Sequence, residues 1–263
     1  MEINNIIDLS IFQMIAAYVF VILVLIMVKI RGISREKEIV ISTIRMTLQL
    51  ILTGYILVYV FDNISPLITI VIIIIMEAFA IHNIYKRTKT KLSNKIKKII
   101  AISMILGTLS SLLFFLFVVI NISPWYDPRY FIPIAGMLIG NSMTGISLGV
   151  TRLIDGIHSK KNLVESALML GATPKMASKE IVDNAFDSAI LPTINSMVGM
   201  GIVFLPGMMT GQILSGISPV TAIEYQIAIM LGILGSVALT VILFVNLGYK
   251  TFFNEESQLE LEE

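Results

Sequence analysis

Long apolar runs separated by short polar stretches cover most of this chain. Several runs exceed the roughly 18 residues that a helix needs to cross a bilayer. Because lipid cannot satisfy backbone hydrogen bonds, each run predicts a transmembrane helix. We therefore expect an all-α polytopic membrane protein with a single transmembrane domain over residues 1–263. About seven spans are expected, at residues 11–30, 40–60, 66–84, 99–120, 132–153, 190–210 and 220–249.

The longest polar stretch, residues 154–189, lies between the fifth and sixth expected spans. Its sequence predicts two short amphipathic helices joined by a turn at Gly171. Thr173 suits the N-cap of the second helix, and Pro174 suits its first position, where the missing N–H costs nothing. The apolar face of that helix consists of Ala177, Ile181, Ala185 and Ala189. Such an element is typical of a surface that docks on a membrane or on a partner protein.

The distribution of positive charge predicts the orientation of the spans. All but two of the 19 Lys and Arg residues lie in stretches on one side of the expected membrane. The exceptions are Arg129, on the other side, and Arg45, within the second span. By the positive-inside rule the richer side is cytoplasmic. The N-terminus is then outside, residues 154–189 form a cytoplasmic coupling loop, and residues 251–263 form an acidic, solvated tail on the cytoplasmic side.

Composition excludes several classes of protein. The chain is 56% hydrophobic and 14% charged, which is not typical of a soluble domain. It has no cysteine, and its two histidines are too few for a multi-histidine metal centre. It contains no GxxxxGKS or GxxxxGKT phosphate loop, and no HExxH or GxSxG motif. We therefore expect no enzymatic activity, no cofactor in this chain and no nucleic-acid partner, with energy supplied by another polypeptide or by an ion gradient.

Glu77 lies deep in the third expected span, where a charged side chain costs at least about 2.5 kcal/mol. A carboxylate there suits a hard or borderline cation, so Glu77 is a candidate metal ligand. A structural hydrogen bond to another helix, or a carboxyl group kept neutral by burial, is an equally open reading.

Other polar or soft side chains are candidates to line a translocation path. Arg45 and Gln49 share one stripe of the second span, although Arg45 could also snorkel to the cytoplasmic surface. Asn141 and Asn195 are expected to be buried amides, with either a path or a structural role. Methionine more often packs than binds metal. With Glu77, the path candidates are Arg45, Gln49, Asn141, Asn195, Met208 and Met209.

The fifth expected span carries a stripe of small residues, namely Gly136, Gly140, Thr144, Ser147 and Thr151. Small residues let helix backbones approach closely in a membrane, so ordinary helix packing explains the stripe. A role in lining a pore or in facing a second copy of the chain is the alternative.

The segment ESALMLGATP resembles the EAA-type coupling loop of ABC importer permeases. In that motif an E-A-A triplet precedes a glycine by three residues, and the glycine lies at the turn between two short helices. Position 166 departs from the pattern, because it is Ser. The resemblance implies docking on a separate ATPase through Glu165, Ala167, Gly171, Ala172, Thr173 and Pro174.

Four longer strings, IPIAGMLIGN (132–141), LGATPKMAS (170–178), LPTINSM (191–197) and LPGMMTGQILSGISPVTAIEYQI (205–227), closely resemble the FetB family. These are iron-export ABC permeases of bacteria, whose plant relatives are linked to aluminium tolerance. The resemblance implies a cell-membrane permease subunit that exports iron or a related metal. It also implies a permease homodimer and a FetA-type ATPase partner that binds ATP and Mg. A gradient-driven secondary transporter or channel for a metal ion or small solute is the alternative.

Overall fold

The computed structural model describes residues 8–88 and 92–260, and these residues are helical apart from turns and two isolated β-bridges. They divide into two compact units. The first unit holds the chain up to Ile64 together with residues 214–216, and the second holds the remainder. The helical content confirms the all-α prediction.

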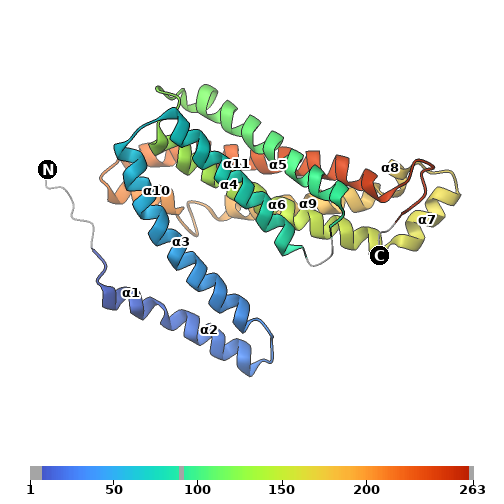
Figure 1. The fold of residues 1–263 in the computed structure, drawn as a ribbon, viewed down its shortest axis with the longest axis horizontal. Helices are drawn as coiled ribbons and strands as arrows, with labels where there is room; N and C mark the ends of the chain where they lie inside the picture. The colour runs from blue at the N-terminus through green and yellow to red at the C-terminus, as the bar shows by residue number, and fades with distance from the viewer. Residues whose placement is uncertain (1–7, 89–91, 261–263) are drawn as a thin grey trace. The chain divides into compact units, whose positions relative to one another are not determined.

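The first unit is built from three helices: α1 (Ile11–Ala17), α2 (Val19–Ile30) and α3 (Glu36–Asp62). Ser10 caps the start of α1 in a capping box. Its side chain accepts from the backbone N–H of Gln13, and the side-chain oxygen of Gln13 accepts from the backbone N–H of Ser10. The helices α2 and α3 pack together (Figure 1). The hydroxyl groups of Tyr18 and Thr47 are hydrogen bonded at 2.6 Å and tie this pair together.

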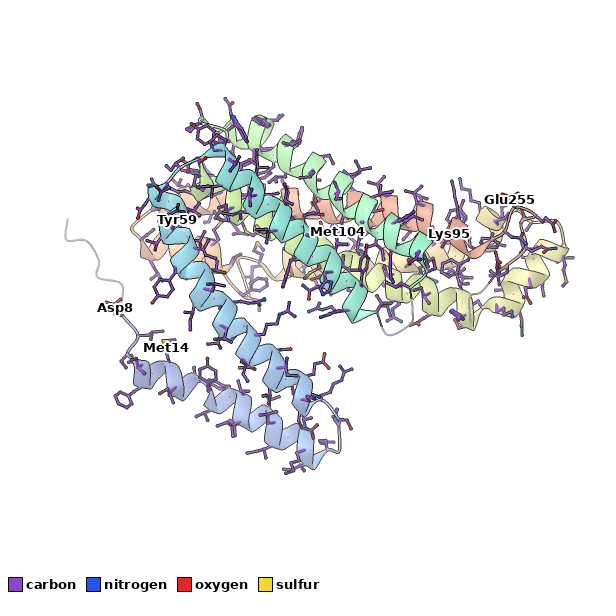
Figure 2. The ribbon with its side chains drawn as sticks, in the orientation of Figure 1. Asp8, Met14, Tyr59, Lys95, Met104 and Glu255 are labelled. Carbon is purple, nitrogen blue, oxygen red and sulfur yellow. The ribbon has the colours of Figure 1, made fainter. Side chains whose placement is uncertain are left out.

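The second unit is a helical bundle centred on α6 (Pro128–Ser159) and α11 (Pro219–Gly248). Around them pack α4 (Pro66–Arg87), α5 (Asn94–Phe114) and α9 (Lys179–Gly199), as Figure 1 shows. A π-helix, η1 (Phe115–Ile120), continues α5. Met104 in α5, labelled in Figure 2, is completely buried in this bundle.

Glycines set how closely these helices approach. A Cβ atom on Gly107 of α5 would lie 2.7 Å from the Cα atom of Thr240 in α11. A Cβ atom on Gly145 of α6 would lie 2.8 Å from Val237, and one on Gly156 would lie 2.5 Å from Ile181 of α9. At each of these glycines the backbone of one helix therefore contacts the neighbouring helix directly, a close approach that small residues permit in membranes.

Six helical segments among the described residues are long and apolar enough to cross a membrane, by length and composition. They are Ile11–Ile30, Glu36–Asp62, Pro66–Arg87, Asn94–Ile120, Pro128–Ser159 and Pro219–Phe252. The expected span at 190–210 is wrong as a single helix, because α9 ends at Gly199. Gly201 then adopts a φ of +83°, and Pro206 precedes the separate short helix α10 (Gly207–Leu214).

The predicted coupling loop, 154–189, is also shorter than expected. Residues 154–159 continue α6, and residues 179–189 already belong to α9. Two short helices remain between them, α7 (Lys161–Met169) and α8 (Pro174–Ala177). We call residues 160–178 the coupling hairpin.

The acidic tail predicted at 251–263 is not simply solvated over its described part. The 3-10 helix η2 (Tyr249–Phe252) buries Phe252. The chain then folds back, and the N–H of Glu260 donates to the carbonyl of Phe252 at 2.8 Å. Residues 261–263 lie outside the described residues.

A methyl group at Gly107 tests the close approach of α5 and α11. Gly107→Ala should destabilise the protein by about 1–3 kcal/mol, because the new Cβ meets backbone that cannot move without separating the helices. Gly140→Ala is the matched control, since nothing lies within 4 Å of a Cβ there. Thermal unfolding in detergent, followed by the fluorescence of Trp125, gives the comparison. Equal stability of the two variants would contradict the packing described here.

Candidate functional site

The coupling hairpin turns sharply at Gly171. The helix α7 ends in a Schellman motif, in which the N–H of Ala172 donates to the carbonyl of Ala167 at 3.0 Å and the N–H of Gly171 donates to that of Leu168 at 2.9 Å. Gly171 has a φ of +88°, a conformation that glycine adopts without a steric penalty. The spacing from Ala167 to Gly171 therefore has a structural reason. The carbonyl of Ala167 accepts a hydrogen bond of the helix cap, and Gly171 adopts the left-handed conformation that the same cap requires.

The second arm of the hairpin begins as the sequence predicts. The Thr173 side chain accepts from the N–H of Met176 at 3.3 Å, and Pro174 occupies the first helical turn. Ser178 ends α8, and its buried hydroxyl donates to the carbonyl of Pro174 at 2.7 Å. The predicted N-cap and the predicted first residue of this helix are both confirmed.

Several contacts fix the base of the hairpin to the bundle. Val164 of α7 is completely buried. The ammonium group of Lys160 donates to Glu180 at 2.6 Å, which joins the end of α6 to the start of α9. Glu165 is half-buried and pairs with Lys161 at 3.8 Å, one turn earlier on α7. The hairpin is therefore anchored at both ends to α6 and α9 of the bundle.

The tip of the hairpin exposes large apolar side chains. Met169 is 86% exposed, Leu170 is 89% exposed and Met176 is 69% exposed. They flank the turn from both arms and lie off the buried side of either helix. Exposed apolar side chains gathered at the tip of a polar element are a candidate interaction surface. These three residues were not predicted from the sequence. The feature that could have identified them is the presence of apolar residues on both sides of the turn at Gly171, outside the apolar face of the second helix.

Polar side chains follow one face of α6 and α9, and we call this set the polar seam. Asn141, Thr144, Thr151 and Asp155 are exposed on α6, while Asn184 and Asn195 are exposed and Ser188 half-buried on α9. Gly149 lets α6 contact Ala189 of α9 behind this face. Our expectation that Asn141 and Asn195 are buried is wrong. The tight interface between the helices is filled by small apolar residues, which leaves the amides outside it.

A cavity of about 410 Å³ lies next to the coupling hairpin and includes Asp155, Asn184 and Ser188 of the polar seam. Six polar residues line it, namely Arg152, Asp155, Ser159, Lys160, Asn184 and Ser188. The cavity therefore offers a polar surface for a hydrated or charged solute at the end of the bundle that carries the hairpin. Arg152, Asp155 and Asn184 were not among the candidates predicted from sequence.

Glu77 is buried in α4, with 6% of its surface exposed. Its Oε2 atom lies 3.1 Å from the hydroxyl of Thr108 in α5, whereas its Oε1 atom has no hydrogen-bond partner. The described residues contain no group of three or more His, Asp or Glu side chains that could hold a metal ion. Glu77 thus makes the interhelical hydrogen bond that we considered, and a ligand role stays a prediction.

The other path candidates are dispersed. Arg45 and Gln49 are exposed on α3 of the first unit. Met209 is buried in the second unit, and Met208 packs against the hydrophobic core there. Both methionines therefore have the packing role that is common for this residue.

Comparisons with known proteins give a consistent family. Residues 11–253 match the family described as "Uncharacterised protein family (UPF0014)". The chain is 34% identical to the UPF0014 membrane protein YjkA of Bacillus subtilis, over 93% of this chain and 96% of that protein. It is 36% identical to Protein ALUMINUM SENSITIVE 3 of Arabidopsis thaliana, over 93% and 88%.

A third relative carries a functional name. The chain is 35% identical to the probable iron export permease protein FetB of Escherichia coli, over 86% of each chain. No solved structure matches. These relatives confirm the resemblance noted from the sequence, and with the apolar helices they confirm a multi-pass membrane location.

Two substitutions at Glu77 separate hydrogen bonding from charge. Glu77→Gln should keep the stability of the native protein, because its amide can donate to the hydroxyl of Thr108. Glu77→Ala should lower it by about 2–5 kcal/mol, since it removes the hydrogen bond and leaves a cavity. Thermal unfolding in detergent measures both. A Gln variant as unstable as the Ala variant would show that the fold requires the negative charge.

Proposed function

This chain belongs to the UPF0014 family of membrane proteins, and we propose that it is the permease subunit of an ABC transporter that exports iron or a related metal. A separate ATPase subunit binds ATP and Mg and supplies the energy. The observation that carries this proposal is the apolar tip of the coupling hairpin, Met169, Leu170 and Met176. An ATPase groove that covers this tip would remove the apolar surface from water.

The hairpin also has the mechanical connection that such a role needs. It is anchored to the bundle by the buried Val164 and by the ion pair of Lys160 with Glu180. Its two ends continue into α6 and α9, and Gly156 keeps these helices in contact at the base of the hairpin. Closure of an ATPase dimer would therefore move α6 and α9 together relative to the rest of the bundle.

The polar seam supports a homodimer. Asn141 and Asn195 are exposed on apolar helices, and polar side chains in contact with lipid are unfavourable. A second copy that faces the seam would shield it and enclose a polar path between the two chains. Two permease copies also match the two ATPase subunits of the proposed assembly, and closed two-fold symmetry is the commonest arrangement of homo-oligomers.

The iron cargo and the outward direction rest on the relative named as a probable iron export permease. The cavity lined by Arg152, Asp155 and Asn184 is where the cargo would enter, because it opens beside the hairpin on the side that charge predicts to be cytoplasmic. A gradient-driven transporter is the competing function, and it predicts transport that continues without any ATPase.

A charge at the hairpin tip tests the docking role. Leu170→Asp should abolish copurification of the ATPase subunit and leave thermal stability unchanged, because the side chain is 89% exposed. Cells that express the variant with the ATPase should retain iron that cells with the native pair export. Asn162→Asp is the control, since it adds the same charge to an exposed position of α7 away from the tip. ATPase capture by Leu170→Asp would contradict docking; unchanged iron content with the native pair would contradict the cargo.

The absence of cysteine makes crosslinking across the dimer unambiguous. Thr144→Cys, on the polar seam, should give a covalent dimer when membranes are treated with a short bis-maleimide. Ile105→Cys, on an exposed apolar face of α5, should stay monomeric. Gel electrophoresis under denaturing conditions distinguishes the two. Dimers at position 105 and none at 144 would place the interface elsewhere.

A further inference from the structure

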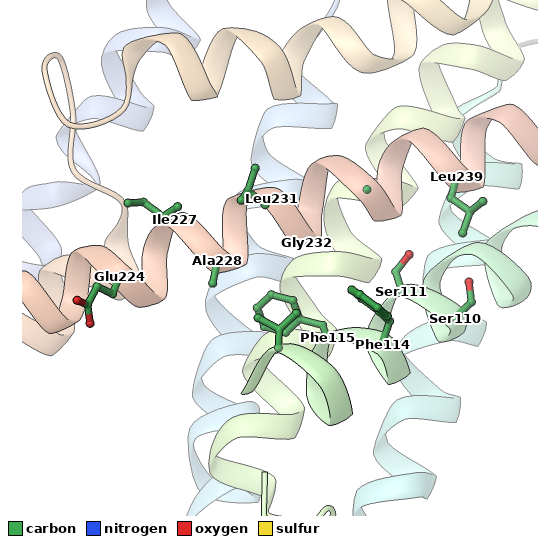
Figure 3. Close-up of a pocket in the computed structure, with 12 residues that line it drawn as sticks. Ser110, Ser111, Phe114, Phe115, Glu224, Ile227, Ala228, Leu231, Gly232 and Leu239 are labelled. Atoms are coloured by element: carbon green, nitrogen blue, oxygen red, sulfur yellow. The ribbon is translucent and has the colours of Figure 1, made fainter. Parts of the chain in front are cut away.

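In contrast to the polar seam, another part of the bundle surface forms an apolar groove. It occupies about 790 Å³ between α11 and the helix formed by α5 and η1 (Figure 3). Its walls are the exposed side chains of Phe114, Ile227, Leu231 and Leu239. All of its lining residues belong to the second unit.

Two glycines of α11 create the groove. Gly232 lets the ring of Phe115 pack against the helix, because a Cβ atom there would lie 2.8 Å from that ring. Gly235 faces open space, with nothing within 4 Å of a Cβ atom. The groove is therefore a gap in the row of α11 side chains, walled by the start of the π-helix, and π-helical segments are frequent at functional sites.

The polar groups of the groove lie at its two ends, with Glu224 at one end and Ser110 and Ser111 near Leu239 at the other (Figure 3). Ser110 and Ser111 donate to backbone carbonyls of their own helix, at 2.5 Å to Leu106 and at 2.8 Å to Gly107. Their hydroxyl protons are therefore not available to donate to a ligand. Glu224 is the one ionisable residue in the lining, and it has no partner among the described residues. Figure 3 shows Glu224 at one end of the row and Leu239 at the other.

The length of the groove matches one leaflet of a bilayer. Glu224 and Leu239 are 15 residues apart on α11, which corresponds to about 22 Å at 1.5 Å per residue. Half of a bilayer measures roughly 20–22 Å when its headgroup region is included. A groove that begins with a carboxylate near the end of a membrane helix and continues as apolar surface therefore has the profile of a single lipid molecule.

We propose that this groove is a binding site for a phospholipid with a primary ammonium headgroup, such as phosphatidylethanolamine. One of its two acyl chains lies over Gly235 between Phe114 and Leu231, and the ammonium group donates to the carboxylate of Glu224. Charge complementarity selects the headgroup, because a carboxylate repels an anionic lipid and forms a charge-assisted hydrogen bond with an ammonium group. The site is independent of the transport cycle proposed above.

Two variants separate the groove from its charge. The protein is reconstituted in vesicles of equal phosphatidylethanolamine and phosphatidylglycerol, extracted in mild detergent, and its retained lipid is measured by native mass spectrometry. The native protein should retain phosphatidylethanolamine preferentially. Gly235→Phe should lose most of this lipid, because the ring fills the groove. Glu224→Gln should keep bound lipid but lower the preference by about two- to fivefold, the range expected for one exposed ion pair.

Ile105→Phe is the matched control, since it adds aromatic volume to an exposed apolar position of α5 that does not line the groove, and it should retain lipid like the native protein. The proposal is overturned if Gly235→Phe retains as much phosphatidylethanolamine as this control, or if Glu224→Gln leaves the preference unchanged. It is also overturned if Leu231→Cys crosslinks two copies efficiently, because the groove would then hold protein.

Discussion

The close approach of α6 to its neighbours is the constraint on which the second unit depends. Helices in lipid gain little from burying apolar surface against one another, so association relies on tight van der Waals packing. Gly145 and Gly156 let α6 contact Val237 of α11 and Ile181 of α9, and Gly107 lets α5 contact Thr240. These contacts bring α6 and α9 against each other along their length, and the hairpin of residues 160–178 connects the two helices.

The same packing explains the two chemically different exposed surfaces of the bundle. Where α6 meets α9, small apolar residues fill the interface and displace the amides of Asn141 and Asn195 to the outside. Where α5 meets α11, Gly232 lets the ring of Phe115 pack against α11. Gly235, almost one turn later, has no neighbour and leaves a gap between the side chains of α11. The polar surface of α6 and α9 suits a polar or protein neighbour, whereas the apolar groove between α5 and α11 suits hydrocarbon.

The coupling hairpin illustrates which local features are readable from sequence. The Schellman cap at Gly171 and the N-cap at Thr173 depend on residues within a few positions of each other, so the string from Glu165 to Pro174 was sufficient to predict the turn. The exposed tip was not predicted. Whether Met169 and Leu170 are covered depends on how α7 packs against the bundle through Val164, which sequence alone does not report.

Hydropathy and charge were enough to identify an all-α, multi-pass membrane protein, because length and polarity of a segment decide whether lipid can accommodate it. Of the predicted stripe, Ile181, Ala185 and Ala189 are buried on α9, as helical periodicity indicates. Ala177 is half-buried on the separate helix α8, because the expected single helix is interrupted at Ser178. The break after Gly199 and the folded segment after Phe252 are local, but hydropathy does not report them. Packing decided the rest. The exposure of Asn141 and Asn195 and the groove at Gly235 depend on neighbours distant in the chain, and periodicity carries no information about which neighbour a helix meets.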